Sequence, residues 1–318
     1  MPYVPIIDIS RDPDVVGAEL DAVCRTVGFF QITGHGLADG VADRAWAAAT
    51  SFFDLPLDDK LSVRVPDDGT PYGYIPVAGE SLSRSVAGSA PPDLKEVFNI
   101  GPVTAPDHAM TDPDERSVYA PNLWPAALPE LRAAWTAYYT GMSALGARLM
   151  SLFARGLGLA PEFFADKIDQ QPNALRAINY PERDAAPLPG QLRAGAHTDY
   201  GTLTVLRQDA VGGLEVLDTG GHWAGVEAVP GAFVINIGDL MARWTNDQWR
   251  STLHRVVDPP DAEASRARRQ SMPYFQNANW SAEVTCLPTC LAAGEAPRYE
   301  PVLAGPHLMA KFRKAVQV

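Results

Sequence analysis

The chain has 318 residues, of which 46% are hydrophobic, and its mean hydropathy is −0.10, so a large core can form and wholesale disorder is excluded. A formal net charge of −12 argues against nucleic acid and anionic membrane as partners, because both select clustered positive charge. Three cysteines make no disulfide framework, and the sequence shows no leader-like segment and no stretch of roughly 20 apolar residues, so we expect a cytoplasmic protein. A monomer is the default expectation, because the sequence does not specify an oligomeric state.

The first half of the chain is predicted to alternate short strands with helices. Strands are expected over residues 4–9 and 29–32. A helix is expected over about 13–27, where a capping residue and an early proline precede apolar residues at helical spacing. A second helix should span about 39–53. Residues 128–159 carry apolar side chains at the spacing of one long amphipathic helix, which we expect to pack against a sheet.

Residues 62–92 lose hydrophobic periodicity and are rich in Ser, Gly and Pro. A run of this length without regular structure is typical of a lid or binding loop in a compact enzyme. Tyr74 and Arg84 fall in this run and are candidate substrate contacts, although an arginine in a loop is more often simply solvated. A second proline-rich loop is expected over about 102–126.

From residue 174 onward the pattern changes to short strands with glycine-rich connections, which is typical of a closed or sandwiched antiparallel β unit. A last short helix is expected over about 306–316. The predicted strands cover residues 174–180, 202–207, 213–217, 222–229, 232–237, 254–257, 269–276 and 281–287.

The strongest chemical signal is a His-x-Asp motif that a second histidine can complete. Side chains two residues apart in a strand share a face, so His197 and Asp199 can project into one pocket. His254 can join them if the sheet folds back on itself. Two imidazoles and one carboxylate on one face of an octahedron suit Fe(II) and leave the opposite face open for O₂ and a co-substrate. Three protein ligands also suit catalytic zinc, but no HExxH motif and no obvious general base accompany them.

An Arg-x-Ser motif follows the second histidine. Arg269 and Ser271 share strand parity, so a guanidinium and a hydroxyl should face inward together, and this pair suits a carboxylate. Arg266 and Arg268 compete for the same role, but only Arg269 has a serine two residues on and directly precedes an apolar strand.

At this point the chain resembles the isopenicillin N synthase-like branch of the Fe(II)/2-oxoglutarate-dependent oxygenases. Segments that look like those of the family occur along most of the chain. They are Val4-Pro5-Ile6-Ile7-Asp8, Gly28-Phe29-Phe30-Gln31-Ile32, Gly34-His35-Gly36, Asp93-Leu94-Lys95-Glu96-Val97-Phe98, Asn179-Tyr180-Pro181, Gly212-Gly213-Leu214, Val234-Ile235-Asn236-Ile237-Gly238-Asp239 and Trp244-Thr245-Asn246.

The resemblance implies a mostly β fold with flanking helices around a double-stranded β-helix, or distorted jelly roll. We expect a single oxygenase domain over residues 1–318. Its N-terminal helical support region should occupy 1–170, its double-stranded β-helix core about 171–290, and its C-terminal tail and helix about 291–318.

The resemblance also assigns roles to the motif residues. Fe(II) would be held by the two histidines and the aspartate of the ligand motif, with 2-oxoglutarate and O₂ as co-substrates. Arg269 and Ser271 would bind the distal carboxylate of 2-oxoglutarate, and Tyr180 can add a hydrogen bond to it. Arg176 shares the parity of Tyr180, so it either clamps a substrate carboxylate or forms an internal ion pair. Phe275 is either a wall of the substrate pocket or part of the core.

We therefore expect a dioxygenase that oxidises an unactivated C–H bond of a small organic substrate, by hydroxylation, desaturation or ring formation. A natural-product or amino-acid-derived intermediate is the expected substrate, which places the enzyme in secondary metabolite biosynthesis. The alternative is a 2-oxoglutarate-independent Fe(II) oxidase of the isopenicillin N synthase type, because those enzymes also carry Arg-x-Ser.

Overall fold

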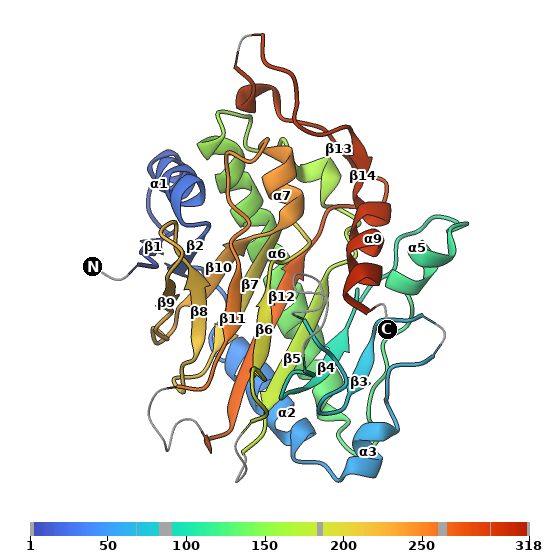
Figure 1. Cartoon of the computed structure of the whole chain (residues 1–318). Helices are drawn as coiled ribbons and strands as arrows, with labels where there is room; N and C mark the ends of the chain where they lie inside the picture. The colour runs from blue at the N-terminus through green and yellow to red at the C-terminus, as the bar shows by residue number, and fades with distance from the viewer. Residues whose placement is uncertain are drawn as a thin grey trace.

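The computed structural model describes residues 3–67, 69–82, 91–182, 187–259, 266–292 and 294–316. The chain is layered (Figure 1): two β-sheets face each other, and the longest helices cover the outer side of the larger sheet. The two candidate histidines lie on the smaller sheet, the candidate aspartate directly follows one of its strands, and the Arg-x-Ser motif lies on the larger sheet. Both motifs line one cavity between the sheets.

The larger sheet is built around a central buried strand, β12, which pairs antiparallel with β5 on one side and β7 on the other. In the described chain the strand order is β1-β2-β10-β7-β12-β5-β4-β3, and β1 runs parallel to β2. The strands are β1 (Ile6–Asp8), β2 (Phe29–Thr33), β3 (Gly73–Ile75), β4 (Glu96–Ile100), β5 (Ala174–Tyr180), β7 (Leu203–Gln208), β10 (Phe233–Ile237) and β12 (Arg269–Gln276).

The smaller sheet has the order β6-β11-β8-β9, and its neighbouring strands pair antiparallel. Valines and leucines from this sheet pack against Phe29, Tyr180 and Val234 of the larger sheet and form a second core between the sheets. Its strands are β6 (Ala194–His197), β8 (Leu214–Leu217), β9 (Trp223–Gly225) and β11 (His254–Val256).

Helices α1 (Pro13–Thr26), α2 (Val41–Phe53) and α6 (Glu130–Gly156) form the main core with the larger sheet. The Asp12 side chain caps α1 by accepting hydrogen bonds from two backbone amides of its first turn. The shorter helices are α3 (Leu57–Leu61), α5 (Pro113–Val118), α7 (Asp239–Trp244) and α9 (Ala304–Val316), with 3-10 turns at Ala165–Lys167 and Pro288–Cys290.

A pair of glycines allows α1 and α6 to approach closely. A Cβ built on Gly156 would lie 2.4 Å from the carbonyl oxygen of Gly17, and a Cβ on Gly17 would lie 3.0 Å from the backbone nitrogen of Gly156. A larger side chain at Gly156 therefore forces the two helices apart, which would disturb the layer that supports the larger sheet, and one at Gly17 would make tight contacts.

The predicted fold class is confirmed, and the long helix and most predicted strands occur close to their predicted bounds. The prediction of a core strand over 281–287 is wrong. Only β13 (Glu283–Val284) forms there, and it pairs with β14 (Val302–Leu303) in a separate small sheet. The run 62–92 also contains β3, and β1 to β4 extend the larger sheet, so the N-terminal half supplies strands as well as helices.

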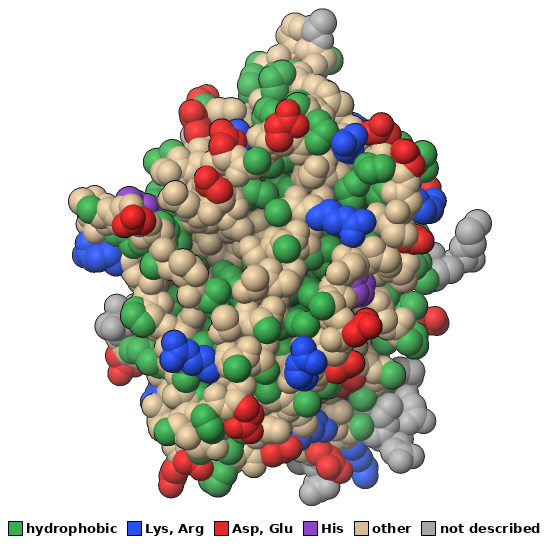
Figure 2. Space-filling model, turned by 180° about the vertical axis from the view of Figure 1, so that it is seen from behind, with side chains coloured by type: hydrophobic (Ala, Val, Ile, Leu, Met, Phe, Trp, Pro, Cys, Tyr) green, Lys and Arg blue, Asp and Glu red, His purple; other side chains and the backbone are tan. Residues whose placement is uncertain are grey.

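The face of the molecule opposite the smaller sheet carries acidic and basic side chains that are interspersed among hydrophobic ones (Figure 2). No described helix has both the length and the apolar character that are needed to cross a membrane.

Candidate metal centre

His197 and His254 are brought together by the pairing of two strands. His197 ends β6, His254 begins β11, and the two residues lie directly opposite each other in the antiparallel register. Their rings are 4.3 Å apart between centroids. The buried Phe29 ring packs against the His254 ring in a T-shaped arrangement, with 5.1 Å between the ring centroids. Strand pairing and packing therefore fix both imidazoles.

Backbone carbonyls determine which ring nitrogen of each histidine carries the proton. The Nδ1 atom of His197 lies 2.7 Å from the carbonyl oxygen of Gly195, and that of His254 lies 3.1 Å from the carbonyl oxygen of Thr252. A carbonyl oxygen only accepts, so each Nδ1 donates and each Nε2 retains a lone pair. Burial and the neighbouring imidazole lower the pKa of His197 to about 3, so this ring is neutral at pH 7.

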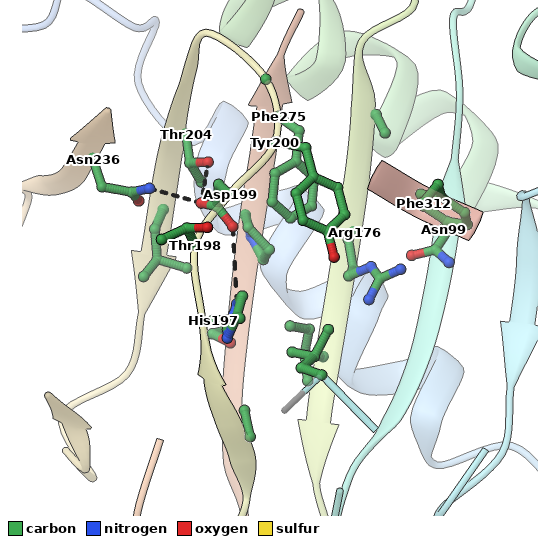
Figure 3. A pocket seen from close by; sticks show the side chains of 18 of the residues that line it. Asn99, Arg176, His197, Thr198, Asp199, Tyr200, Thr204, Asn236, Phe275 and Phe312 are labelled. Carbon is green, nitrogen blue, oxygen red and sulfur yellow. Dashed lines mark hydrogen bonds and ion pairs between the residues drawn. The ribbon is translucent and has the colours of Figure 1, made fainter. Parts of the chain in front are cut away.

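Asp199 follows β6 and is oriented by two side chains of the larger sheet. Its Oδ2 atom accepts hydrogen bonds from Thr204 Oγ1 at 2.5 Å and Asn236 Nδ2 at 2.7 Å (Figure 3). Thr204 and Asn236 are cross-strand partners on β7 and β10. Burial alone raises the pKa of Asp199, but the two imidazoles and these hydrogen bonds outweigh that effect, so the pKa lies below its ordinary value.

The three side chains leave one electron-pair donor each for a common centre. Oδ1 of Asp199 lies 3.9 Å from Nε2 of His197 and 3.8 Å from Nε2 of His254, which is too long for hydrogen bonding. One ligand atom from each residue lies within 4.8 Å of the others. Two imidazoles and a carboxylate, each held through its other polar atom, fit a divalent metal ion.

A buried guanidinium lies in the same cavity. Arg269 is 1% exposed, and it donates to the carbonyl oxygen of Gly212, to Gln208 Oε1 and to Ser271 Oγ at 2.9, 3.2 and 3.3 Å. These acceptors are all neutral, and no carboxylate pairs with Arg269 among the described residues. The described residues therefore leave this positive charge uncompensated, and a bound carboxylate would neutralise it.

Strand register places Tyr180 and Ser271 beside this guanidinium. Tyr180 lies opposite Arg269 in the β5–β12 pairing, and the guanidinium carbon is 4.9 Å from the centre of its ring. Both Ser271 and Tyr180 are buried and line the cavity. Of the competing arginines, Arg266 is exposed, and Arg268 pairs with Asp54 outside the cavity.

The cavity has a volume of about 220 Å³, and Arg269, the three candidate ligands, Arg176 and Phe275 all line it. In the β5–β12 register Arg269 pairs with Tyr180 at one end and Phe275 pairs with Ala174, near Arg176, at the other. Arg176 is paired with Glu80 through two hydrogen bonds of 3.0 and 3.3 Å. Phe275 lines the cavity. The prediction for Tyr74 is wrong, because its hydroxyl donates to Glu96 and its ring packs in the helix-side core. Arg84 lies outside the described residues.

Sequence reasoning missed several residues that orient the predicted ones. Thr204 and Asn236 are polar residues between two apolar neighbours on their strands, and that pattern was the available signal. Gln208 stands between Arg207 and Asp209, so no such signal marks it. Asn99 on β4 and Tyr72 just before β3 line the cavity, although neither strand was predicted.

Comparison with known proteins places the chain among non-haem oxygenases. Residues 4–127 match the model of the "non-haem dioxygenase in morphine synthesis N-terminal" family, and residues 172–278 match that of the "2OG-Fe(II) oxygenase superfamily". The second match spans the candidate ligands and the Arg-x-Ser motif.

Individual relatives match over nearly the whole chain. A 2-oxoglutarate-Fe(II) type oxidoreductase from Emericella nidulans is 34% identical over 94% of this chain and 86% of its own. Validamycin A dioxygenase from Streptomyces hygroscopicus is 36% identical over 92% of this chain and 81% of its own. The crystal structure of a full-length Neurospora crassa protein in complex with alpha-KG and thymine is 30% identical, covers 99% of this chain and 97% of its own, and has a TM-score of 0.85.

Proposed function

The chain belongs to the 2OG-Fe(II) oxygenase superfamily and is an Fe(II)- and 2-oxoglutarate-dependent dioxygenase, and we propose the following roles for its site residues. His197, Asp199 and His254 hold the metal ion. Arg269 and Ser271 bind the distal carboxylate of 2-oxoglutarate, beside the ring of Tyr180. The substrate occupies the part of the cavity that ends at Arg176 and Phe275.

One observation carries the co-substrate assignment: Arg269 is buried next to the ligand cluster without a protein carboxylate among the described residues. A keto diacid held at the metal ion by its keto-acid end would find this guanidinium in the same cavity as a partner for its distal carboxylate. The residues then act by placement. Hydrogen bonds to Gln208 and to the carbonyl of Gly212 fix the orientation of the Arg269 guanidinium, and its remaining N–H donors therefore have a fixed direction.

When bound, Fe(II) and 2-oxoglutarate supply the activation of O₂ that oxidises a C–H bond of the substrate. The protein's own residues position the reactants and exclude water. Leu206, Leu214 and Val256 line the cavity near the ligands, and this apolar wall leaves little room for bulk water. Hydroxylation, desaturation and ring formation are all compatible with this arrangement.

The substrate is a compact organic molecule, in line with a cavity of about 220 Å³, which is smaller than the roughly 300–1,000 Å³ of pockets for drug-sized ligands. We assign it to the natural-product or amino-acid-derived intermediates, because the named relatives include a validamycin A dioxygenase and a proline hydroxylase. We further propose that the enzyme acts in the cytoplasm as a monomer. Its net charge of −12 argues against nucleic acid and anionic membranes as partners.

The test is anaerobic reconstitution with Fe(II) and 2-oxoglutarate, followed by a screen for substrate-triggered O₂ consumption and succinate release. Proline, validamycin A and thymine enter the screen because the names or titles of relatives mention them. Turnover should require 2-oxoglutarate, and O₂ uptake that persists without it would instead indicate the oxidase alternative. A His197→Ala variant should lose metal binding and turnover but keep its circular dichroism spectrum, and retained activity would contradict the ligand assignment.

A further inference from the structure

Two polar side chains lie together at the far end of the cavity from Arg269. Asn99 on β4 and Arg176 on β5 are directly opposite each other in the antiparallel register, and both line the cavity. Figure 3 shows them side by side, on strands that are separate from those of the candidate ligands. Asn99 and Arg176 therefore form a polar subsite that the proposed metal and 2-oxoglutarate sites do not use.

Asn99 presents an acceptor that the protein leaves unused. The residue is 4% exposed, its Nδ2 faces the carbonyl oxygen of Pro71 at 3.5 Å, and its Oδ1 has no hydrogen-bond partner in the described part of the chain. Because Nδ2 points to a carbonyl, the amide orientation that leaves Oδ1 free is the favoured one. A buried acceptor without a partner is costly, so the site calls for an N–H or O–H group from a ligand.

Arg176 presents N–H donors on a guanidinium whose positive charge is already compensated by Glu80. The guanidinium uses two N–H groups on Glu80, and the described residues offer no partner for its other three. Glu80 also lies 3.6 Å from Lys95, which pairs with Asp93 at 2.8 Å. Two positive and two negative side chains thus balance in one row, in which Lys95 and Asp93 are buried and Arg176 and Glu80 are partly buried. A carboxylate bound here would add an uncompensated negative charge, whereas a neutral carbonyl oxygen would not.

From these two observations we propose that the polar subsite recognises a neutral –C(=O)–NH– edge, as in a lactam, an imide or a ureide. The carbonyl oxygen accepts from the free N–H groups of Arg176, and the adjacent N–H donates to Asn99 Oδ1. This assignment rests on the proposed function, since it names the class of molecule whose C–H bond faces the metal centre.

The surrounding walls suit a compact cyclic amide. Phe275 on β12, Tyr72 before β3 and Phe312 on α9 line the cavity with aromatic rings. The hydroxyl of Tyr72 donates to the carbonyl oxygen of Val118 at 2.6 Å, which fixes its ring as part of the wall. Apolar walls with one polar edge place a small ring in one orientation, because only one side of it can hydrogen-bond.

The test measures binding to the Fe(II)- and 2-oxoglutarate-loaded enzyme by anaerobic calorimetry, so turnover is not needed. Three probe pairs differ only in the N–H group: 2-piperidinone and its N-methyl form, glutarimide and its N-methyl form, and thymine and 1,3-dimethylthymine. We expect at least one N–H member to bind about tenfold or more tightly than its methylated partner. Proline and benzoate serve as carboxylate probes that compete for the same polar subsite.

Variants separate hydrogen bonding from the bulk of the methyl group. Asn99→Leu should reduce the preference for the N–H member to about twofold or less. Asn279→Leu changes an asparagine outside the cavity and should leave the preference intact. A prior 2-oxoglutarate titration confirms that each variant retains a loaded site.

Three results would overturn the assignment: no preference in any pair, a preference that survives in Asn99→Leu, or tighter binding of the carboxylate probes than of every amide. Failure of the proposed function is separate, because it appears earlier as loss of 2-oxoglutarate binding to the Fe(II) protein.

Discussion

The hydrogen bond from Thr204 to the candidate metal ligand Asp199 offers a sharp test of how the centre is built. A Thr204→Val substitution keeps the shape of the side chain but removes the hydroxyl, which donates to Asp199 Oδ2 at 2.5 Å. Thr204 is only 3% exposed, so water cannot easily replace the lost donor. The carboxylate then keeps only the hydrogen bond from Asn236.

A hydrogen bond to a charged group contributes about 1.5–3 kcal/mol, which corresponds to about 10- to 150-fold in an equilibrium constant. Because Asn236 still orients the carboxylate, we expect metal affinity to fall by about 10- to 100-fold. The measurement is an anaerobic titration of the metal-free protein with Fe(II), and with Co(II) as a spectroscopic substitute.

Thr202→Val is the matched control. Thr202 is equally buried, and its hydroxyl donates to the carbonyl oxygen of Gln276 at 2.7 Å rather than to a candidate ligand. Both variants should lose similar stability, but only Thr204→Val should lose metal affinity. Equal metal affinity in wild type and Thr204→Val, or an equal loss in Thr202→Val, would refute the reasoning.

Three further predictions address the co-substrate, acid stability and helix packing. Arg269→Lys removes the planar fork while keeping the charge, so calorimetry should show a rise of about 10- to 100-fold in the Kd of 2-oxoglutarate, and unchanged binding would contradict the assignment. Glu80→Gln should lower the free energy of unfolding by about 2–3 kcal/mol at pH 7, because it leaves a half-buried guanidinium without its carboxylate. Burial raises the pKa of Glu80, but the neighbouring cations lower it below 4.5 overall, so this stabilisation is present above pH 4.5 and is lost as pH falls through the folded-state pKa. The free energies of unfolding of the two proteins should therefore converge as the pH falls below 4.5, and a gap that stays constant would count against the ion pair. Gly156→Ala should cost about 1–3 kcal/mol in thermal unfolding, because the new methyl would lie 2.4 Å from the Gly17 carbonyl oxygen, whereas Gly225→Ala, in open space, should change stability by less than about 0.5 kcal/mol.

The candidate site could be predicted from sequence where strand periodicity decides it. The alternation of a strand places Arg269 and Ser271 on one face, and both side chains do line one cavity. Family resemblance supplied what periodicity lacks, namely that His254 returns to face His197. That pairing depends on the register of two strands far apart in the chain, which local residue patterns do not determine.

The substrate end of the cavity could not be predicted in the same way. Tyr74 was expected there, but Tyr72 takes the place, although alternation alone would put both on one face. Gly73 between them has a φ of +127°, a conformation that only glycine adopts readily, and it breaks the alternation. Asn99 was missed because β4 was not predicted as a strand, so its side chain could not be assigned to a face. The ligand and co-substrate roles themselves stay predictions until binding is measured.

The origin of the cavity walls in different parts of the fold has a consequence for engineering. The candidate metal ligands lie on β6, directly after it and on β11. The wall residues Tyr72, Asn99, Val118 and Phe312 come instead from the region of β3, from β4, from α5 and from α9. A combinatorial library confined to these four positions changes the shape and polarity of the far end without touching the ligands or Arg269. Directed evolution can therefore change the substrate selectivity of this enzyme while the candidate metal ligands stay the same.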